Sequence, residues 1–486
     1  MHMQTFATRV IGPTFEEMLH PHHIHAALRE RALTAAQDEP LDPVNLYNIT
    51  WRGPDGRCHF QLLPRELTGV EANIVVLHGC RFPTGSLKVG PAYAVLAEKV
   101  LSGDAIPSVH TCVWPSTGNY GIGGTWVAGC MSFESVVVMP QQMSPERFDL
   151  IRRYGGRIIV TSGSGSNVRE VFQKCTELVR GAPERYRVLN QFDSMGNYRF
   201  HYYVTGNTIA ELASELADVG VGKGQVDAYV SAVGSGGTIA AGDRIKQVFA
   251  AARVVGVEPI QCSTLFNNGY GHHEVQGIAD RQVTWIHNVA NMDAIMAIDD
   301  LECKQGLQLL AEETGWHAMI HRYGVPEPSV RRMATSFGIS GVCNLLAAIK
   351  TAKFYELGRD HLIVTVATDG IDRYRSVLAQ MSEEHKMDEV EAAVRLVSIF
   401  HKQKLDWIKE ATTDIRRAWH NLKYYTWVAQ QGKTIEELEA QQSHDYWLAE
   451  QAKVAGIDQQ ILERRTTVQS QAKSPLVHRP LPKRGW

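Results

Sequence analysis

The segment DAYVSAVGSGGTIAAGDRIKQVFAAARVVGVEP, residues 227–259, holds the pattern that decides the fold. A largely apolar run (227–233) is followed by a glycine-rich turn, a helical pattern (238–249) and a second apolar run (253–259). Neither run alternates between apolar and polar residues, which is typical of strands covered on both faces. The segment therefore predicts two parallel strands joined by a helix.

Short apolar runs and helical patterns alternate in the same way from about residue 72 to residue 378. The runs are ANIVVLHG (72–79), SVVVMP (135–140), RIIVTSG (157–163), DAYVSAVG (227–234), RVVGVEP (253–259) and LIVTVATDG (362–370). This alternation predicts the α/β class, with mostly parallel open sheets and helices on both faces. Residues 1–71 are expected to form a separate, turn-rich N-terminal segment.

The pattern of strands stops after about residue 380, so residues 379–486 are expected to form an all-α extension with a loose tail. Its predicted buried stripe consists of Val390, Val394, Val397, Leu405 and Ile408. Thr434 and Glu437 have the spacing of a capping box and predict the start of a further helix. Half of the ten tryptophans lie here, at positions 407, 419, 427, 447 and 486. They indicate either a subunit contact or packing of the extension onto its own chain.

Charge and cysteine content exclude several classes of protein. The 49 Lys and Arg residues nearly balance 52 Asp and Glu residues, so the chain has no basic field that would attract nucleic acid. No run of about 18 apolar residues is present, and we predict no membrane span. The eight cysteines form no CxxC pair, which indicates reduced thiols in a cytoplasmic protein.

A histidine cluster flanks Pro21 and consists of His20, His22, His23 and His25. Four imidazoles could hold a metal ion. We interpret them as a solvated loop, on the view that no carboxylate or cysteine stands at ligand spacing, and we predict no metal site.

A lysine follows a Pro-Thr-Gly-Ser turn in RFPTGSLKVGPAYAVL, residues 81–96. Lys88 precedes an apolar helical pattern, so its amine is expected at a helix start in a dry cleft. Desolvation and the positive end of the helix both favour the neutral amine, which can condense with a carbonyl group. A surface lysine whose stem covers the helix is the alternative interpretation.

Two more loops at predicted strand ends carry backbone and hydroxyl donors. The first precedes a small-residue helix and consists of Ser116, Thr117, Gly118, Asn119 and Tyr120. It suits a small carboxylate. The second consists of Gly234, Ser235, Gly236, Gly237 and Thr238 and suits a phosphate. A dinucleotide-binding unit has a similar outline and would use Glu258, but its G-x-G-x-x-G motif needs glycine where the chain has Ile239.

Together these loops resemble the cysteine synthase and cystathionine β-synthase group of pyridoxal-phosphate enzymes, the β-family or fold type II. PTGSLK (83–88) is similar to the lysine loop of the family, STGNYGIG (116–123) to its substrate loop and GSGGT (234–238) to its phosphate loop. Other similar segments are VMPQQMSPERFDLIRRYGGRIIVTSG (138–163), NQFDSMGNYRFHYYVTGNTIAEL (190–212), VGVEP (255–259), HHEVQGIA (272–279), SFGISG (336–341) and ATDGIDRY (367–374). The resemblance covers roughly residues 75–378.

The resemblance implies a role for each matching residue. Lys88 would form the Schiff base with pyridoxal 5'-phosphate and then move the α-proton of the substrate. The loop 234–238 would bind the phosphate, Asn119 the ring hydroxyl and Ser340 the pyridine nitrogen. The substrate carboxylate would be held by Ser116, Thr117, Gly118 and Gln191, beside Tyr120, which replaces the usual threonine. Residues 72–378 would form the catalytic domain with two subdomains, the small mobile one at about 92–200.

A serine beside the pyridine nitrogen makes the ring a weaker electron sink than an aspartate would, which suits β-elimination and disfavours transamination. We therefore expect α,β-elimination or β-replacement on a small amino acid with a β-leaving group, through an aminoacrylate, as in cysteine synthase. One alternative is an ammonia-releasing lyase or dehydratase, and a more distant one is a dinucleotide-binding protein. A homodimer or higher homo-oligomer is expected, with the C-terminal helices as a candidate contact.

Four further polar residues have two interpretations each. His272 and His273 either meet a polar group of the substrate or are merely exposed in a glycine-rich loop. Asp369 and Asp372 either close a hydrogen-bond network near the pyridine or cap a helix.

Overall fold

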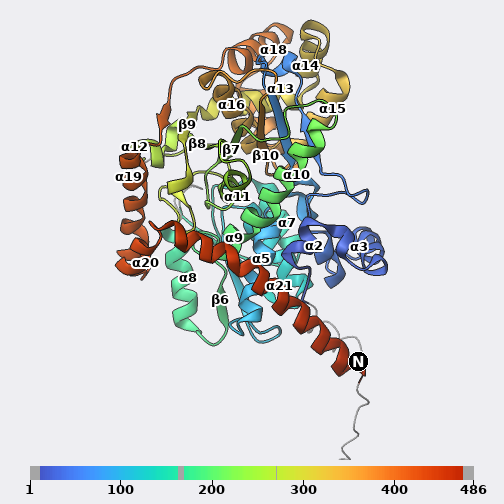
Figure 1. The fold of residues 1–486 in the computed structure, drawn as a ribbon, viewed down its shortest axis with the longest axis vertical. Helices are drawn as coiled ribbons and strands as arrows, with labels where there is room; N and C mark the ends of the chain where they lie inside the picture. Colours follow the sequence, from blue (N-terminus) through green and yellow to red (C-terminus); the bar gives the residue numbers. More distant parts are fainter. Residues whose placement is uncertain (1–10, 163–168, 270, 474–486) are drawn as a thin grey trace, which may run out of the picture.

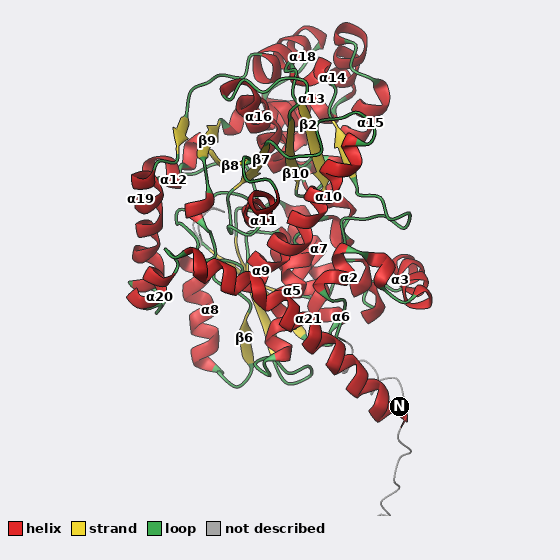
Figure 2. Ribbon diagram, in the orientation of Figure 1, coloured by secondary structure: helices red, strands yellow, loops and turns green. Residues whose placement is uncertain are grey.

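Two sheets surrounded by helices make up the computed structural model, which describes residues 11–162, 169–269 and 271–473 (Figures 1 and 2). The larger sheet has seven strands in the order β1-β2-β10-β7-β8-β9-β11. Its strands are β1 (Phe60–Leu62), β2 (Asn73–His78), β7 (Ala228–Ala232), β8 (Arg253–Pro259), β9 (Ala294–Ile298), β10 (Leu362–Ala367) and β11 (Ile408–Glu410). The five inner strands are parallel, and the edge strands β1 and β11 pair antiparallel.

The smaller sheet has four parallel strands in the order β5-β4-β3-β6. They are β3 (Thr111–Pro115), β4 (Glu134–Pro140), β5 (Arg157–Thr161) and β6 (Tyr186–Val188). Every residue of β3 is buried, and so is every residue of β4 except the first. This burial is expected of apolar runs that are covered on two faces. The predicted α/β class with mostly parallel sheets is confirmed.

Helices cover both sheets. Those near the smaller sheet are α5 (Val89–Leu101), α6 (Asn119–Cys130), α7 (Pro145–Arg153), α8 (Arg169–Gly181) and α9 (Met195–Phe200), whereas α10 (Gly206–Ala217) lies beside the larger sheet. Those near the larger sheet are α4 (Arg65–Thr68), α11 (Ala241–Val248), α12 (Thr264–Asn267), α13 (Asp300–Ala311), α14 (Glu313–His317), α15 (Glu327–Ser336), α16 (Ile339–Phe354) and α17 (Arg375–Glu384). Helix α16 packs on β7, β9 and β10 and is buried from Ile339 through Ala352.

From residue 11, where the described part of the N-terminal segment starts, the chain forms α2 (Phe15–Leu19) and α3 (Ala26–Asp38), joined by a 3₁₀ turn at Pro21–His23. Thr14 caps α2 in a capping box with Glu17. Phe15 and Met18 are buried in the same core cluster as α5 and α6. The segment is therefore packed against the rest of the chain, and its strand β1 forms one edge of the larger sheet.

The C-terminal extension is helical except for β11. Its helices are α18 (Glu389–Arg395), α19 (Thr413–Lys423), α20 (Ile435–Ala440) and α21 (His444–Lys473). The predicted capping box of Thr434 and Glu437 is present at the start of α20. In Figure 1, α21 crosses α9 and α5 and reaches α2, and these helices are in contact. The predicted loose tail lies outside the described residues from position 474 onward.

The predicted buried stripe of the extension is wrong. Val390, Val394 and Leu405 are exposed, whereas the helical turn between them buries a different face. The buried residues are Ala392, Ala393, Leu396, Ile399 and Phe400. Val390 and Val394 lie on the solvent side of α18, because the face that packs on the core is the neighbouring one with Ala392, Ala393 and Leu396. The chain continues as a π-helix over Leu396–His401.

Three tryptophans of the extension are buried within the chain. The indole N–H groups of Trp419 and Trp427 donate to the carbonyl oxygens of Leu265 and Val283, both at 2.7–2.8 Å. Trp447 is also buried, against Tyr198 of α9. Of the two interpretations, packing onto the chain itself therefore accounts for these side chains, which are not available for a subunit contact.

All eight cysteines are free thiols, and seven of them are buried, as the sequence indicates. Within the described residues, no helix combines the length and the apolar character that crossing a bilayer requires.

Candidate functional site

Lys88 lies at the start of α5, in the position that precedes the first helical residue. The turn before it is held to the end of β10, because Leu87 N–H and Ser86 Oγ both donate to the carbonyl oxygen of Thr368, at 3.1 Å each. The lysine side chain is 9% exposed, and its Nζ lies 3.4 Å from Ser235 Oγ. The predicted lysine loop and glycine loop thus meet, and the alternative of a surface lysine is excluded.

Lys88 and Asp280 line the same small cavity. Burial lowers the pKa of the Lys88 amine to about 8, against the opposing effect of the Asp280 and Asp369 carboxylates. Burial raises the pKa of Asp280 to about 7, against the opposing effect of Lys88. Near neutral pH, part of the Lys88 amine and part of the Asp280 carboxyl group are therefore uncharged. The uncharged amine makes Lys88 a better nucleophile than an exposed lysine.

The glycine loop connects β7 to a 3₁₀ turn at Thr238–Ala240. Gly236 has φ +78°, and a Cβ atom there would lie 2.5 Å from Thr284 Oγ1, so only glycine fits. Ser235 Oγ accepts a hydrogen bond of 3.0 Å from Asn197 Nδ2. The loop is therefore fixed from two sides, by α9 and by the segment around Thr284.

The residues beside this loop fit a phosphate group. Thr284 Oγ1 and both ring nitrogens of His287 are buried and have no hydrogen-bond partner among the described residues. Burial lowers the pKa of His287 to about 3, so its ring is neutral and offers one N–H donor. A phosphate at this loop would find hydroxyl, imidazole and backbone donors whose capacity the protein itself leaves unused.

The loop 116–120 forms a second wall of the cavity. Ser116 Oγ accepts hydrogen bonds from the N–H groups of Gly118 and Gly121, at 3.0 and 2.8 Å. Gly118 has φ +146°, and a Cβ atom there would lie 2.5 Å from Arg147, so the tight turn into α6 requires glycine. Tyr120 is 2% exposed, and its hydroxyl is buried without a partner among the described residues.

Asn119 belongs to a buried polar network. Its Nδ2 donates to Asp369 Oδ2 at 2.6 Å, and its Oδ1 accepts from Arg373 Nε at 2.6 Å. Tyr374 OH donates to Asp369 Oδ2 at 3.0 Å. Asp369 therefore closes a network and caps no helix, whereas Asp372 is half exposed and pairs with Arg373.

The cavity borders a larger cleft of about 360 Å³, and Thr117, Gly277 and Ile278 line both. One wall of the cleft is the segment 142–145 after β4, and the other includes residues 376–381 around α17. His272 and His273 line this cleft. Burial lowers the pKa of His273 to about 4, and its Nε2 lies 3.1 Å from the carbonyl oxygen of Ala279.

The structure brings most of the predicted site residues to one cavity. The predicted residues that line it are Lys88, Ser116, Thr117, Asn119, Tyr120, Gln191, Gly234 and Ser235. The others do not line it: Gly118 and Gly236–Thr238 form the turns behind it, and Ser340 is buried in the first turn of α16. Sequence reasoning missed Asp280, Thr284 and His287, although Asp280 directly follows the quoted segment HHEVQGIA.

Glu258 does not fit the dinucleotide interpretation. Its carboxylate is buried and accepts hydrogen bonds from the backbone N–H groups of Leu265 and Phe266, at 2.9–3.2 Å. Both oxygens are thus used at the start of α12, and the residue is not free for a ribose.

Comparison with known proteins agrees with the geometry. The model of the family described as "Pyridoxal-phosphate dependent enzyme" matches residues 60–320. The cysteine synthase of Staphylococcus aureus is 29% identical over 295 residues, which cover 60% of this chain and 84% of that protein. A probable cysteine synthase of Bacillus subtilis is also 29% identical over 295 residues, 60% of this chain and 85% of that protein.

Solved structures show the same fold. An O-acetyl serine sulfhydrylase (isoform 3) from Entamoeba histolytica is 25% identical, with a TM-score of 0.57 over 73% of this chain and 99% of that one. A hydrogen sulfide-producing enzyme from Fusobacterium nucleatum is 24% identical, with a TM-score of 0.57 over 73% of this chain and 94% of that one. Because the family model matches more than half of the chain, the protein belongs to the family of pyridoxal-phosphate-dependent enzymes.

Proposed function

We propose that this enzyme carries out α,β-elimination or β-replacement on a small amino acid with a leaving group on its β-carbon. The observation that carries this proposal is the buried Lys88 amine, which faces Ser235 of the glycine loop in the cavity that opens to the larger cleft. The relatives named cysteine synthase support the same reaction class. The bound cofactor would supply the electron sink for the carbon that carries the amino group.

Lys88 and the glycine loop would bind the cofactor. Lys88 Nζ would hold the cofactor and, once displaced by the amino acid, would take the proton from its α-carbon. Its lowered pKa supports this role, because a neutral amine can both attack a carbonyl and accept a proton. The loop 234–238 would bind the phosphate, with Thr284 and His287 as additional donors.

The other wall of the cavity would bind the substrate. Ser116, Thr117 and Gln191 would hold its carboxylate, and Asn119 would orient the cofactor ring from its network with Asp369. Tyr120 lines the cavity, and its hydroxyl has no hydrogen-bond partner among the described residues, which favours a small substrate with a polar group. Ser340, which is buried at the start of α16, would contact the pyridine nitrogen.

We also propose that the enzyme is a cytoplasmic homo-oligomer. Eight free thiols support a reducing compartment. Light scattering on the full chain would test the oligomeric state, because it measures the mass of the assembly. Since three tryptophans of the extension are buried within the chain, we expect the subunit contact on another surface.

The experiment that tests the reaction is product analysis with the purified enzyme and its cofactor. O-acetylserine is offered with and without sulfide, cysteine is offered alone, and amino acids, keto acids and ammonia are measured. A new β-substituted amino acid supports replacement, and a keto acid with ammonia supports the lyase alternative. Lys88→Ala serves as the control and should form neither product. Transamination products, or equal turnover in the Lys88→Ala variant, would contradict the proposal.

A further inference from the structure

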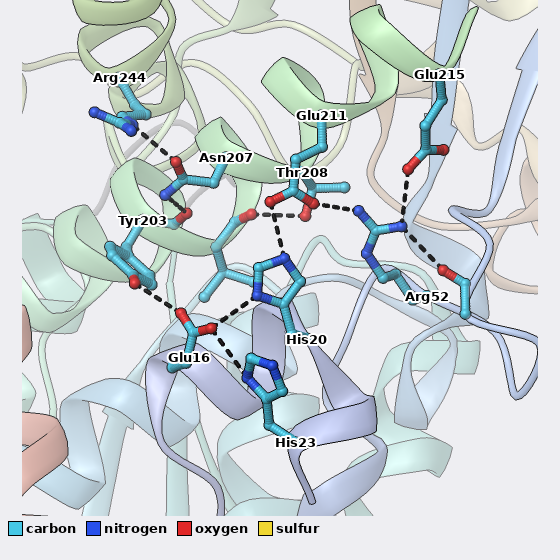
Figure 3. Close-up of polar contacts among 12 residues, drawn as sticks. Glu16, His20, His23, Arg52, Tyr203, Asn207, Thr208, Glu211, Glu215 and Arg244 are labelled. Carbon is cyan, nitrogen blue, oxygen red and sulfur yellow. Dashed lines mark hydrogen bonds and ion pairs between the residues drawn. The ribbon is translucent and has the colours of Figure 1, made fainter. Parts of the chain in front are cut away.

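Two of the four clustered histidines meet one carboxylate at the surface of the N-terminal segment (Figure 3). Glu16 Oε1 lies 2.8 Å from His20 Nδ1 and 3.1 Å from His23 Nδ1. One potential ligand atom from each of these three residues lies within 4.8 Å of the other two. The expectation that no carboxylate stands at ligand spacing is therefore wrong, because Glu16 precedes His20 by one helical turn.

The distances suit a single metal ion. Zinc binds imidazole nitrogen and carboxylate oxygen at about 2.0–2.2 Å, which in tetrahedral geometry places two adjacent ligands roughly 3.3–3.6 Å apart. The Glu16–His20 and Glu16–His23 separations, 2.8 and 3.1 Å, are somewhat shorter, so the three side chains spread slightly to admit the ion. Two nitrogens and one oxygen favour a late first-row divalent cation over Mg²⁺ or Ca²⁺, which prefer oxygen ligands alone.

Two atoms of the candidate ligands that face away from the site, His20 Nε2 and Glu16 Oε2, contact other residues. His20 Nε2 lies 2.9 Å from Glu211 Oε1 on α10, and Glu211 in turn pairs with Arg52. Tyr203 OH donates to Glu16 Oε2 at 2.8 Å (Figure 3). A carboxylate on the outer nitrogen is the usual partner of a metal-binding histidine, because it fixes the orientation of the ring.

Helix α2, which carries Glu16 and ends at His20, is anchored from the C-terminal extension. Asp458 of α21 accepts hydrogen bonds from the backbone N–H groups of Phe15 and Glu16, at 2.7 and 3.1 Å. Arg465 of α21 pairs with Glu17. The side chains of Glu16, His20 and His23 are still 37%, 26% and 47% exposed, so an ion can enter and keep water as its remaining ligands.

We propose that Glu16 Oε1, His20 Nδ1 and His23 Nδ1 bind one late first-row divalent cation, with Zn²⁺ as the expected ion. The ion displaces the protons through which the two rings otherwise bond to Glu16. It binds only when the segment 14–23 is folded, so it stabilises that fold and its contact with α10.

The test is a metal titration of the full-length enzyme with its cofactor, after removal of bound metal by a chelator and desalting. Zn²⁺ is titrated against a chromophoric competitor, and Co²⁺ is added separately to record its visible d–d bands. One equivalent should bind per chain, and the unfolding temperature should rise with Zn²⁺. Glu211→Gln should weaken binding about 10- to 100-fold, as loss of the partner of a metal-bound histidine does.

His23→Ala and Glu16→Gln should abolish the Co²⁺ bands, whereas His22→Ala is the matched control and should leave them unchanged. His22 is an exposed neighbour whose ring lies 4.3 Å from that of His23, but it is not one of the three ligands. Far-ultraviolet circular dichroism without metal checks that each variant is folded. The proposal is overturned if wild type binds no equivalent, if His23→Ala retains the wild-type affinity, or if His22→Ala loses it equally.

Discussion

Burial, rather than a charged partner, gives Lys88 and Asp280 their properties. Desolvation is the largest cause of both pKa shifts, and the attraction between the two groups only opposes it. The cavity therefore contains an amine and a carboxyl group that can each gain or lose a proton near neutral pH. Such shifts concentrate at functional sites.

Asp280→Asn is expected to stabilise the cofactor-free protein at alkaline pH. The folded-state pKa of Asp280 is raised from 3.8 to about 7, so the folded state binds more protons than the unfolded state between these values. Wild-type stability should consequently fall as pH rises from about 4 to 7, by up to a few kcal/mol at about 1.4 kcal/mol per pKa unit. Urea unfolding of both proteins at pH 5 and pH 8 measures the difference, which should be largest at pH 8.

Asp149→Asn is the matched control, because Asp149 is 75% exposed and should give no pH-dependent difference. A constant gap between Asp280→Asn and wild type at both pH values would show that the carboxyl group is not held protonated.

Lys88, Asn119 and the glycine loop could be predicted from the sequence because each stands in a local run of turn residues at a strand end. Asp280, Thr284 and His287 could not, because they enter the site through tertiary packing of a long irregular segment. Glu16 beside His20 was visible in the sequence at helical spacing, but only the structure shows His23 Nδ1 turned toward the same oxygen.

At the scale of elements, α19 connects the extension to the phosphate loop. Lys423 Nζ is buried and donates to the carbonyl oxygens of Trp285 and His287, at 3.0 and 2.7 Å, and to Gln441 Oε1 at 2.6 Å. A Cβ atom on Gly236 would lie 3.2 Å from His287 Cα, so the segment held by Lys423 lies directly against the glycine loop. The extension thus positions one side of the proposed phosphate site.

Lys423→Met should weaken cofactor binding about tenfold, because three acceptors lose their donor and the segment 285–287 loses its anchor. Titration of cofactor-free protein, followed by absorbance, measures the change. Lys402→Met is the control, since Lys402 is an exposed lysine of the same extension. Wild-type affinity in Lys423→Met would contradict a positioning role for α19.

The elements of the core could be predicted better than those of the extension. Each of the six quoted apolar runs contains a strand, because β-branched runs of that length have few other uses. The three-residue strands β1 and β11 carry too little pattern to be recognised, and they form only where an exposed sheet edge offers partners. The π-helix at Leu396–His401 likewise has no periodic signature in the sequence.

At the scale of the molecule, the two sheets meet at the cavity, which lies at the ends of β7 and β10 and of β3. We propose the division into residues 1–71, 72–378 and 379–486, with a small mobile subdomain at about 92–200. The cleft of about 360 Å³ has Thr117 and the segment 142–145 of that subdomain on one side, and Gly277 and Gln380 on the other.

This subdomain is expected to close over bound amino acid, because closure would exclude water and bring the loop 116–120 to the substrate carboxylate. Crystal structures of the enzyme with its cofactor, with and without a non-reacting amino acid, should differ in the distance between Thr117 and Gly277. An unchanged distance across the cleft would contradict this expectation.

The most direct test of the central claim is to reduce the cofactor-loaded enzyme with borohydride, which makes a lysine–cofactor linkage permanent, and to locate the label by peptide mass spectrometry. We expect one label per chain, on the peptide that contains Lys88, and no label in Lys88→Ala. A label on another lysine, or none on cofactor-loaded enzyme, would contradict it.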